Sequence, residues 1–190
     1  KKGHRASQYS LGQIYFYGIL ENNINYNDAA KWYLKAALQG HTASQAKIGW
    51  MLQSGFGVQK DTKQAFYWLE RSMESGSANA QNYFGLIYYQ GKGVSQDYVK
   101  AVEYFEGAIE KNHASAHYNL GIMYQHGHGV KKNSRKSLDL FISAAIQGDA
   151  DAQESLGIMY RKGKVVKKDK RKALYWLTKA AFHGRKNAQY

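Results

Sequence analysis

A pattern of about 36 residues returns five times along this chain, and this repetition restricts the possible folds more than any other feature. One glycine of the pattern recurs at spacings of 37, 36, 36 and 36 residues, as Gly12, Gly49, Gly85, Gly121 and Gly157. A large apolar residue in its second half recurs every 36 residues, as Trp32, Trp68, Tyr104, Leu140 and Trp176. Repetition at this period predicts supersecondary units that bury their apolar faces by stacking on one another.

Each repeat holds two stretches in which apolar residues have helical spacing. In the third repeat the two stripes are Gln81, Phe84, Gly85 and Tyr88, and Ala101, Tyr104, Phe105 and Ala108. Glycine lowers the stability of a helix interior, so its recurrence in the first stripe predicts a neighbouring helix too close for a Cβ atom. Large rings alternate with alanines in the second stripe, which predicts interdigitated packing.

Residues typical of helix ends separate these stretches. A Gly-x-Gly turn ends the first stretch at residues 55–57, 91–93 and 127–129. Side chains that cap helix N-termini precede the second stretch at Asp61, Asp97, Asn133 and Asp169. Residues that tolerate a left-handed backbone follow it at Gly40, Gly76, Asn112, Gly148 and Gly184. No strand pattern lies between them, so the chain is predicted to be all-α and built from antiparallel helix pairs.

The whole repeat, A-x-A-Q-x-x-L-G-x-x-Y-x-x-G-x-G-V-x-x-D-x-x-K-A-x-x-W-x-x-x-A-A-x-x-G, resembles the Sel-one-like repeat (SLR), a relative of the tetratricopeptide repeat. The resemblance implies a right-handed α/α superhelical solenoid with units at residues 5–40, 41–76, 77–112, 113–148 and 149–184. Residues 2–4 resemble the end of a repeat and residues 187–190 the start of one, which predicts a longer array. The first unit has one extra residue after Gly18, and in the last unit Val165 replaces the second glycine of the turn. Both turns are expected to differ in shape.

Composition suits a helical repeat and leaves the compartment open. Hydrophobic residues make up 44% of the chain and proline is absent, as uninterrupted packed helices require. No apolar run approaches the roughly 20 residues that span a membrane. Cysteine is also absent, so nothing indicates a redox compartment. The resemblance alone favours a bacterial origin and a periplasmic or secreted location over a cytoplasmic one.

Positive charge is concentrated near the end of the chain. Residues 161–190 contain eleven basic residues and one acid, and so supply +10 of the net charge of +13. The expected basic patch comprises Lys162, Lys164, Lys167, Lys168, Lys170, Arg171 and Lys172. It can steer an acidic protein, bind anionic lipid or nucleic acid, or only solubilise the chain. No aromatic residue lies within 162–172, which disfavours stacking on single-stranded nucleic acid.

No motif predicts an enzyme. The Gly-x-Gly turns follow helices rather than strands and recur with the repeat, which disfavours a phosphate-binding loop. Ser44 and Lys47 match the S-x-x-K motif by chance, because its companion motifs are missing. His117, His126 and His128 come nearest to a metal site, but neither cysteine nor a nearby carboxylate completes it. No catalytic residue, metal, cofactor or small-molecule substrate is expected.

The first stretch of each repeat has a second face, opposite its apolar stripe, that is richer in rings and amides than a solvated face requires. The residues expected on this face are Tyr9, Gln13, Phe16, Trp50, Gln53, Asn82, Tyr89, Tyr118, Gln125, His126, Glu154 and Arg161. By resemblance to tetratricopeptide proteins, it lines the concave wall of the superhelix. Rings can anchor a bound peptide and amides can satisfy its backbone. Alternatively, neighbouring first helices bury Trp50, Leu86 and Ile122 against one another.

These features lead to the hypothesis of a non-enzymatic scaffold or adaptor that binds a segment of another protein in the concave groove. The basic end favours an acidic partner. The resemblance implies roles in assembly, signalling and bacterial secretion. Two alternatives are an immunity or inhibitor protein that occludes a secreted toxin, and attachment to an anionic surface through the basic patch.

Overall fold

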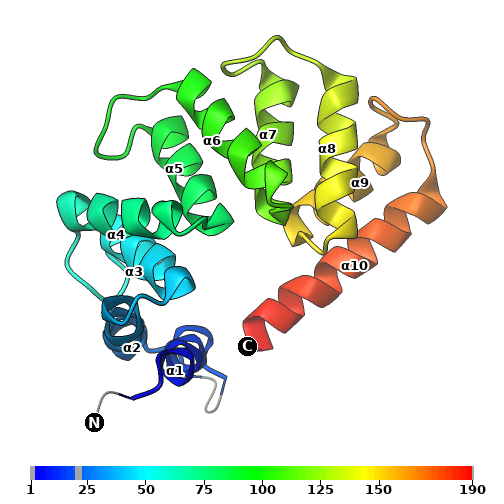
Figure 1. Cartoon of the computed structure of the whole chain (residues 1–190). Helices are drawn as coiled ribbons and strands as arrows, with labels where there is room; N and C mark the ends of the chain where they lie inside the picture. Colours follow the sequence, from blue (N-terminus) through cyan, green and yellow to red (C-terminus); the bar gives the residue numbers. More distant parts are fainter. Residues whose placement is uncertain (1–2, 20–22, 190) are drawn as a thin grey trace. The chain divides into compact units, whose positions relative to one another are not determined.

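The computed structural model describes residues 3–19 and 23–189, with side chains up to Phe182, and this part of the chain is helical with no strand (Figure 1). The helices are α1 (Arg5–Tyr17), α2 (Tyr26–Leu38), α3 (Thr42–Ser54), α4 (Thr62–Glu74), α5 (Ala78–Gln90), α6 (Tyr98–Glu110), α7 (Ala114–His126), α8 (Ser134–Ile146), α9 (Ala150–Lys162) and α10 (Lys170–Gln189). Odd-numbered helices are the first stretch of each repeat and even-numbered helices the second. The predicted all-α array of helix pairs is confirmed.

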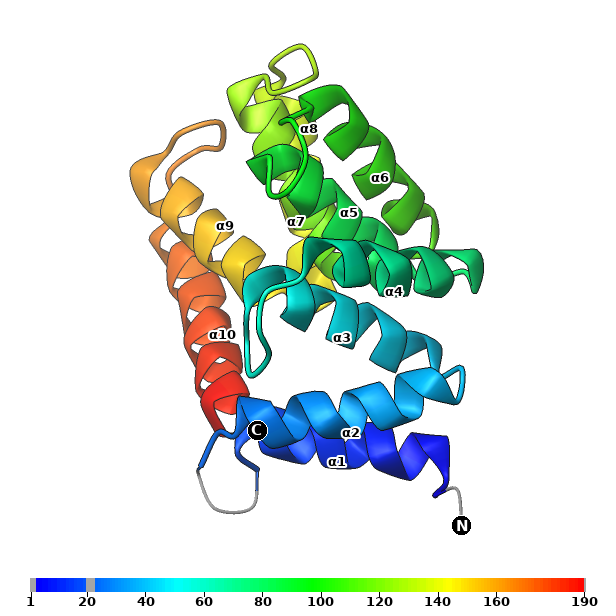
Figure 2. The same cartoon turned by 90° about the vertical axis from the view of Figure 1, so that its left-hand side faces the viewer.

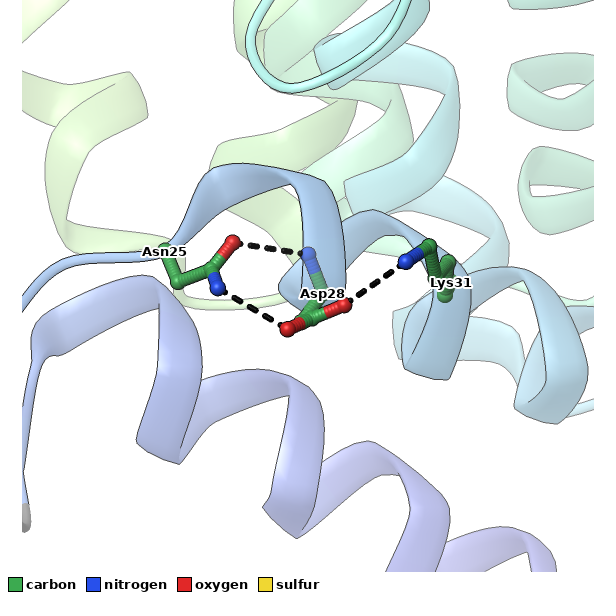
Figure 3. Close-up of polar contacts among 3 residues, drawn as sticks. All are labelled: Asn25, Asp28 and Lys31. Atoms are coloured by element: carbon green, nitrogen blue, oxygen red, sulfur yellow. Dashed lines mark hydrogen bonds and ion pairs between the residues drawn. The ribbon is translucent and has the colours of Figure 1, made fainter.

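The predicted N-caps hold the second helix of each repeat. Asp61, Asp97, Asn133 and Asp169 each accept a hydrogen bond from the backbone N–H three residues on. In the first repeat Asn25 does the same for α2, where its Oδ1 accepts from the Asp28 N–H at 3.0 Å (Figure 3). The Asp28 carboxylate in turn accepts from Asn25 Nδ2 and pairs with Lys31 Nζ, both at 2.8 Å. Such caps satisfy N–H groups that a helix leaves unpaired.

Four of the five predicted left-handed caps are confirmed, and the fifth is wrong. Gly40, Gly76, Asn112 and Gly148 have φ between 57° and 94°. Gly184 instead lies inside α10, which continues to Gln189. After each of the other four caps, the next residue is His41, Ser77, His113 or Asp149, whose side chain caps the following helix. In the sequence, an arginine, which has no hydrogen-bond acceptor, follows Gly184 at the position where the other repeats have a residue that caps the next helix.

The recurrent helical glycines lie where the prediction requires close approach. A Cβ at Gly121 would lie 2.7 Å from the Phe141 ring, and one at Gly157 would lie 2.6 Å from Leu177. Gly12, Gly49 and Gly85 meet Tyr33, Leu69 and Phe105 in the same way. Each pair joins the two helices of one repeat, so the glycine lets a large side chain pack against helix backbone.

The helices form two compact units that divide within α5, the first ending at Phe84 and the second running from Gly85 to Lys186. In the first unit α1 packs on α2, α2 on α3 and α3 on α4, and α1 and α2 lie side by side in both views (Figures 1 and 2). Its core is built on Tyr33, Ile48 and Met51. In the second unit α6, α7, α8 and α9 pack in succession, with cores centred on Phe105 and Phe141.

Buried glutamines join consecutive repeats. Gln153, only 1% exposed, donates from Nε2 to the Ala145 carbonyl near the end of α8, at 2.9 Å. Gln45 makes the same contact with Ala37, at the end of α2, at 3.4 Å. The last carbonyls of a helix have no partner within the helix, so the recurrent glutamine satisfies one and fixes the next repeat on it.

The turn of the last repeat keeps the shape of the others, contrary to expectation. Asp169 donates its N–H to the Tyr160 carbonyl at 3.0 Å, as Asp97 does to Tyr88. To maintain this turn, Val165 adopts φ 70°, where Gly57 and Gly129 have φ 66°. A β-branched residue is strained in that region. In the first repeat, residues 20–22 of the turn lie outside the described residues, as do Lys2 and Tyr190 of the predicted partial repeats.

Val165→Gly is therefore expected to raise the free energy of unfolding by about 1 kcal/mol, because relief of strain outweighs the added entropy of the unfolded chain. The matched control is Val99→Gly, since Val99 is similarly exposed (57% against 50%) but lies in α6. That change should lower stability by about 1 kcal/mol, as glycine does in a helix. Urea unfolding followed by circular dichroism compares them, and two changes of the same sign would contradict the assignment of strain.

Candidate functional site

The residues expected on the second face of the first helices fall into three groups. Seven are half-buried, namely Tyr9, Gln13, Phe16, Trp50, Tyr89, Tyr118 and Gln125. His126, Glu154 and Arg161 are exposed. Gln53 and Asn82 are buried at 4% and 5% exposure, so the expectation that they offer amides to a partner is wrong. Both belong to tightly packed stretches of α3 and α5, where the apolar surroundings extend further round the helix than the sequence indicates.

The strongest feature of this face in the first unit is a cluster of four rings, which we call the aromatic cluster: Phe16, Tyr26, Trp50 and Phe56. Phe16 lies 5.1 Å from Tyr26 and 5.9 Å from Trp50, between ring centroids. Phe56 stacks on Trp50 at 5.0 Å and meets Tyr26 at 5.2 Å. Tyr83 of α5 adds a further stacked ring beside Trp50, at 6.1 Å. These separations are those of favourable ring pairs.

Lys47 of α3 lies against this cluster. Its Nζ is 4.2 Å from the centroid of Phe16, 5.2 Å from Trp50 and 5.7 Å from Tyr17. None of the ion pairs between described residues includes it. Burial lowers the pKa of the Lys47 ammonium to about 8. The rings compensate the cation only in part, since cation–π attraction is weaker than a buried ion pair.

Tyrosine hydroxyls gather near the same place. Burial raises the pKa of Tyr33 and of Tyr83, and the nearby hydroxyls of Tyr9 and Tyr17 raise both further. The Tyr33 hydroxyl is buried and has no hydrogen-bond partner among the described residues. A lone cation among neutral hydroxyl donors, with rings on its flanks, is an environment suited to a carboxylate.

In the second unit the same face carries a smaller set of rings. His128 stacks on Tyr98 at 4.5 Å with the ring planes 7° apart, and Tyr89 lies 5.5 Å from Tyr98. Tyr118 packs on the core residue Phe141, at 5.5 Å. Burial raises the pKa of Tyr118. Leu86 and Ile122 pack against two different cores of this unit, so part of the face supports the fold. The alternative interpretation, in which Trp50, Leu86 and Ile122 are buried against one another, stays a prediction.

The expected basic patch is exposed throughout. Lys162 ends α9, residues 164–168 form the turn, and Lys170, Arg171 and Lys172 begin α10. The single acid, Asp169, is occupied as the N-cap of α10. The patch therefore keeps its positive charge.

The described residues form neither a cluster of metal ligands nor a membrane-spanning helix. His117 Nδ1 is bonded to the His113 carbonyl at 3.0 Å, while His126 and His128 face each other as stacked rings. Among the side chains of residues 3–19 and 23–182, no three His, Cys, Asp or Glu could together hold a metal ion. Over the same residues, no helix is long and apolar enough to cross a bilayer.

Sequence reasoning did not place Lys47 among the candidate binding residues. The only signal was its place in the repeat: two residues before the recurrent glycine, where Tyr83, Asn119 and Ser155 stand in later repeats. A basic residue at a repeat position that is neutral in the other repeats could have drawn attention to Lys47. Its burial among rings of α1 and α3 could not be seen without the tertiary structure.

Comparisons with known proteins identify the repeat. The Sel1 repeat family matches residues 5–41, 42–77, 78–113, 114–149 and 150–181. The solved Sel1 repeat protein from Oxalobacter formigenes is 33% identical with a TM-score of 0.76, over 97% of this chain and 75% of that one. A protective antigen of uropathogenic Escherichia coli with an SLR fold is also 33% identical (TM-score 0.66), over 99% of this chain but only 40% of its own. No curated protein sequence matches the chain.

A more distant likeness concerns the fold alone. An immunity protein from Pseudomonas aeruginosa is 17% identical with a TM-score of 0.59, over 97% of this chain and 83% of that one.

Proposed function

This chain belongs to the Sel1 repeat family, and from that premise we propose that it is a non-enzymatic scaffold that binds an acidic segment of another protein. Proteins of this family are protein-interaction scaffolds. The segment binds on the face of the first helices that carries the aromatic cluster.

The observation that carries the proposal is the Lys47 ammonium, half-buried among rings with no acid paired to it. A buried cation without a counter-ion lowers the stability of a protein that gains nothing from it. A carboxylate from a partner would complete the pair and gain hydrogen bonds from the tyrosine hydroxyls. At Lys47, a carboxylate of the bound partner would therefore offset the cost of burying an unpaired cation in the fold.

The rings around Lys47 suit an interface as well. Tryptophan and tyrosine dominate the binding energy of protein interfaces because they bury a large area with little loss of side-chain entropy. Trp50 and Tyr26 are half-buried and Phe56 is 39% exposed, so part of each ring remains available. The basic patch accelerates encounter with an acidic partner through long-range attraction.

The likeness to the immunity protein does not support that role here, because 17% identity indicates the fold and not the bound partner. Attachment to an anionic surface rests only on the exposed basic patch, which a solubilising role explains equally well. The interaction scaffold is the only one of the three functions that a specific arrangement of side chains favours.

The test is a pull-down from the native cell that compares the unmodified protein with the double variant Trp50→Ala, Tyr118→Ala. One change lies in each unit. Loss of a central ring costs about 2 kcal/mol or more at an interface, so capture of the partner should fall by about 30-fold or more. Circular dichroism shows whether the helices are retained.

The matched control is Tyr67→Ala, Tyr175→Ala, which removes two rings from second helices, 49% and 51% exposed. This variant should capture the partner as well as the unmodified protein. Equal capture by both double variants, with helicity retained, would place the binding site elsewhere.

A further inference from the structure

Four positions recur wherever one repeat meets the next, and we call them the junction positions. They are the residue near the end of a first helix, the residue that starts the second helix, the residue after the next recurrent glycine, and the middle residue of the following Gly-x-Gly turn. Between the first two repeats these are the four rings of the aromatic cluster, Phe16, Tyr26, Trp50 and Phe56. Together the rings fill the junction.

Between the third and fourth repeats the junction is also filled. The positions are held by Tyr89, Tyr98, Ile122 and His128. The three rings lie between 4.5 and 5.8 Å from one another. The contact of the turn with the preceding second helix is so close that a Cβ at Gly129 would lie 2.5 Å from the Tyr98 carbonyl oxygen.

Between the fourth and fifth repeats the junction is hollow. Its positions are held by Gln125, Ser134, Ile158 and Lys164, none of which is a ring. All four line a cavity of about 380 Å³ among α7, α8, α9 and the turn after α9. The remaining lining includes His126, Lys132, Ser137 and Lys162. The cavity thus lies at positions that rings hold in the junctions between the first and second repeats and between the third and fourth.

The chemistry of this cavity is cationic and rich in hydroxyl and amide groups. Lys132, Lys162 and Lys164 surround it, and no acid is among the lining residues. None of the ion pairs between described residues includes any of these lysines. The three lysines are therefore uncompensated.

The deepest polar group has no partner. Ser137 is 1% exposed and lines the cavity, and its hydroxyl makes no hydrogen bond among the described residues. The same position is alanine in every other repeat, as Ala29, Ala65, Ala101 and Ala173. A buried hydroxyl without a partner is unfavourable unless a ligand or water satisfies it. The hydroxyl therefore occurs only in the repeat whose second helix lines this cavity.

We propose that the cavity is an oxyanion-binding site that receives the terminal carboxylate or phosphate of a side chain from a partner protein. The lysines supply charge, and the hydroxyls of Ser137 and Ser134 donate hydrogen bonds to the anion oxygens. The choice of a protein as the source rests on the proposed function, whereas the oxyanion chemistry does not. The site lies in the second unit, apart from Lys47 in the first.

Because Ser137 is buried, the cavity is unsuited to binding the phosphodiester backbone of a nucleic acid. A diester is flanked by sugars on both sides, so its oxygens cannot enter a recess whose innermost donor is 1% exposed. A carboxylate or phosphate at the end of a side chain is narrow enough to do so. Recognition of a protruding group is thus favoured over recognition of a continuous backbone.

The experiment is a titration of the full chain, at constant ionic strength, with inorganic phosphate, with an acetylated peptide containing glutamate, and with the same peptide containing phosphoserine. We expect saturable binding of at least one probe. The variants are Ser137→Ala, which places the residue of the other repeats there, and Lys164→Phe, which refills the junction as Phe56 does. Ser137→Ala should weaken binding about 10-fold, the effect of losing one charge-assisted hydrogen bond, and Lys164→Phe should abolish it.

The control is Lys168→Phe, which removes the same charge from the same turn outside the cavity lining. It should change affinity by less than about 3-fold, as a screened surface charge does. Binding of the phosphoserine probe alone would identify a phosphate source, and binding of the glutamate probe a carboxylate source. An equal loss in Lys164→Phe and Lys168→Phe, or no saturable binding, would overturn the proposal. Because these probes need no partner, that failure leaves the pull-down result on Trp50 and Tyr118 to decide the proposed function.

Discussion

Phe141→Ala is expected to lower the free energy of unfolding by about 3–5 kcal/mol, the usual effect of truncating a buried phenylalanine. Phe141 is fully buried between α7 and α8, and its ring occupies the space that Gly121 leaves open. Neighbouring side chains cannot refill that space, because the glycine contributes none. Urea unfolding followed by tryptophan fluorescence or circular dichroism measures the change.

The matched control is Leu174→Ala on α10, which removes a large apolar side chain that is 68% exposed. Its expected effect is within about 0.5 kcal/mol. If the two variants lost similar stability, the glycine and ring pairs of the repeats would not be the elements that hold each helix pair together.

Lys47→Met is expected to stabilise the protein and to weaken its binding of the partner. The pKa of about 8 for Lys47 in the folded protein lies below the ordinary lysine value of 10.5, so the fold disfavours the protonated lysine. That penalty is fully present below pH 8, declines between pH 8 and 10.5, and is absent above. The variant should therefore gain about 1–3 kcal/mol in unfolding free energy at pH 7, at roughly 1.4 kcal/mol per pKa unit, and less at pH 9.5. Urea unfolding at the two pH values measures it.

The same variant should capture the partner about 10-fold less well, because a charge-assisted hydrogen bond to the partner is lost. Lys63→Met is the control, since Lys63 is exposed in the first turn of α4 and should change neither property. A variant that is both more stable and fully able to bind would show that Lys47 has no part in recognition. A variant that is less stable at pH 7 would contradict the burial of an uncompensated cation.

Most of the fold could be predicted because the same signals for helices, caps and close packing recur in each repeat. A single glycine in a helix is ambiguous, but Gly121 and its four equivalents together indicate close approach, and the caps at Asp61 and Asp97 mark the helix starts. The prediction of a helix end at Gly184 was wrong because a glycine ends the second helix where the next residue can cap a new helix. His41 and Asp149 do so in earlier repeats, whereas the sequence has an arginine after Gly184. The fold was predictable because these glycines and N-caps recur at equivalent positions of the repeats.

The site was predicted only in part, because exposure depends on neighbouring helices. Helical periodicity placed Phe16 and Trp50 on one face, yet it could not show that Gln53 and Asn82 are covered. The hollow junction is visible in the sequence only after the structure shows which four positions meet. Lys47 is likewise buried by rings from two helices. One of these rings, Phe16, lies 31 residues before Lys47 in the sequence, so local periodicity could not reveal the contact.

The most direct test of the binding face is photocrosslinking with p-benzoylphenylalanine placed at a single position. At Phe56, a member of the aromatic cluster, illumination in the native cell should yield a covalent adduct with the partner, and mass spectrometry should assign the crosslink to an acidic segment. At Tyr67, which is comparably exposed (49% against 39%) on the second helix α4, no adduct with that partner should form. A partner crosslinked from Tyr67 and not from Phe56 would contradict binding on the face of the first helices.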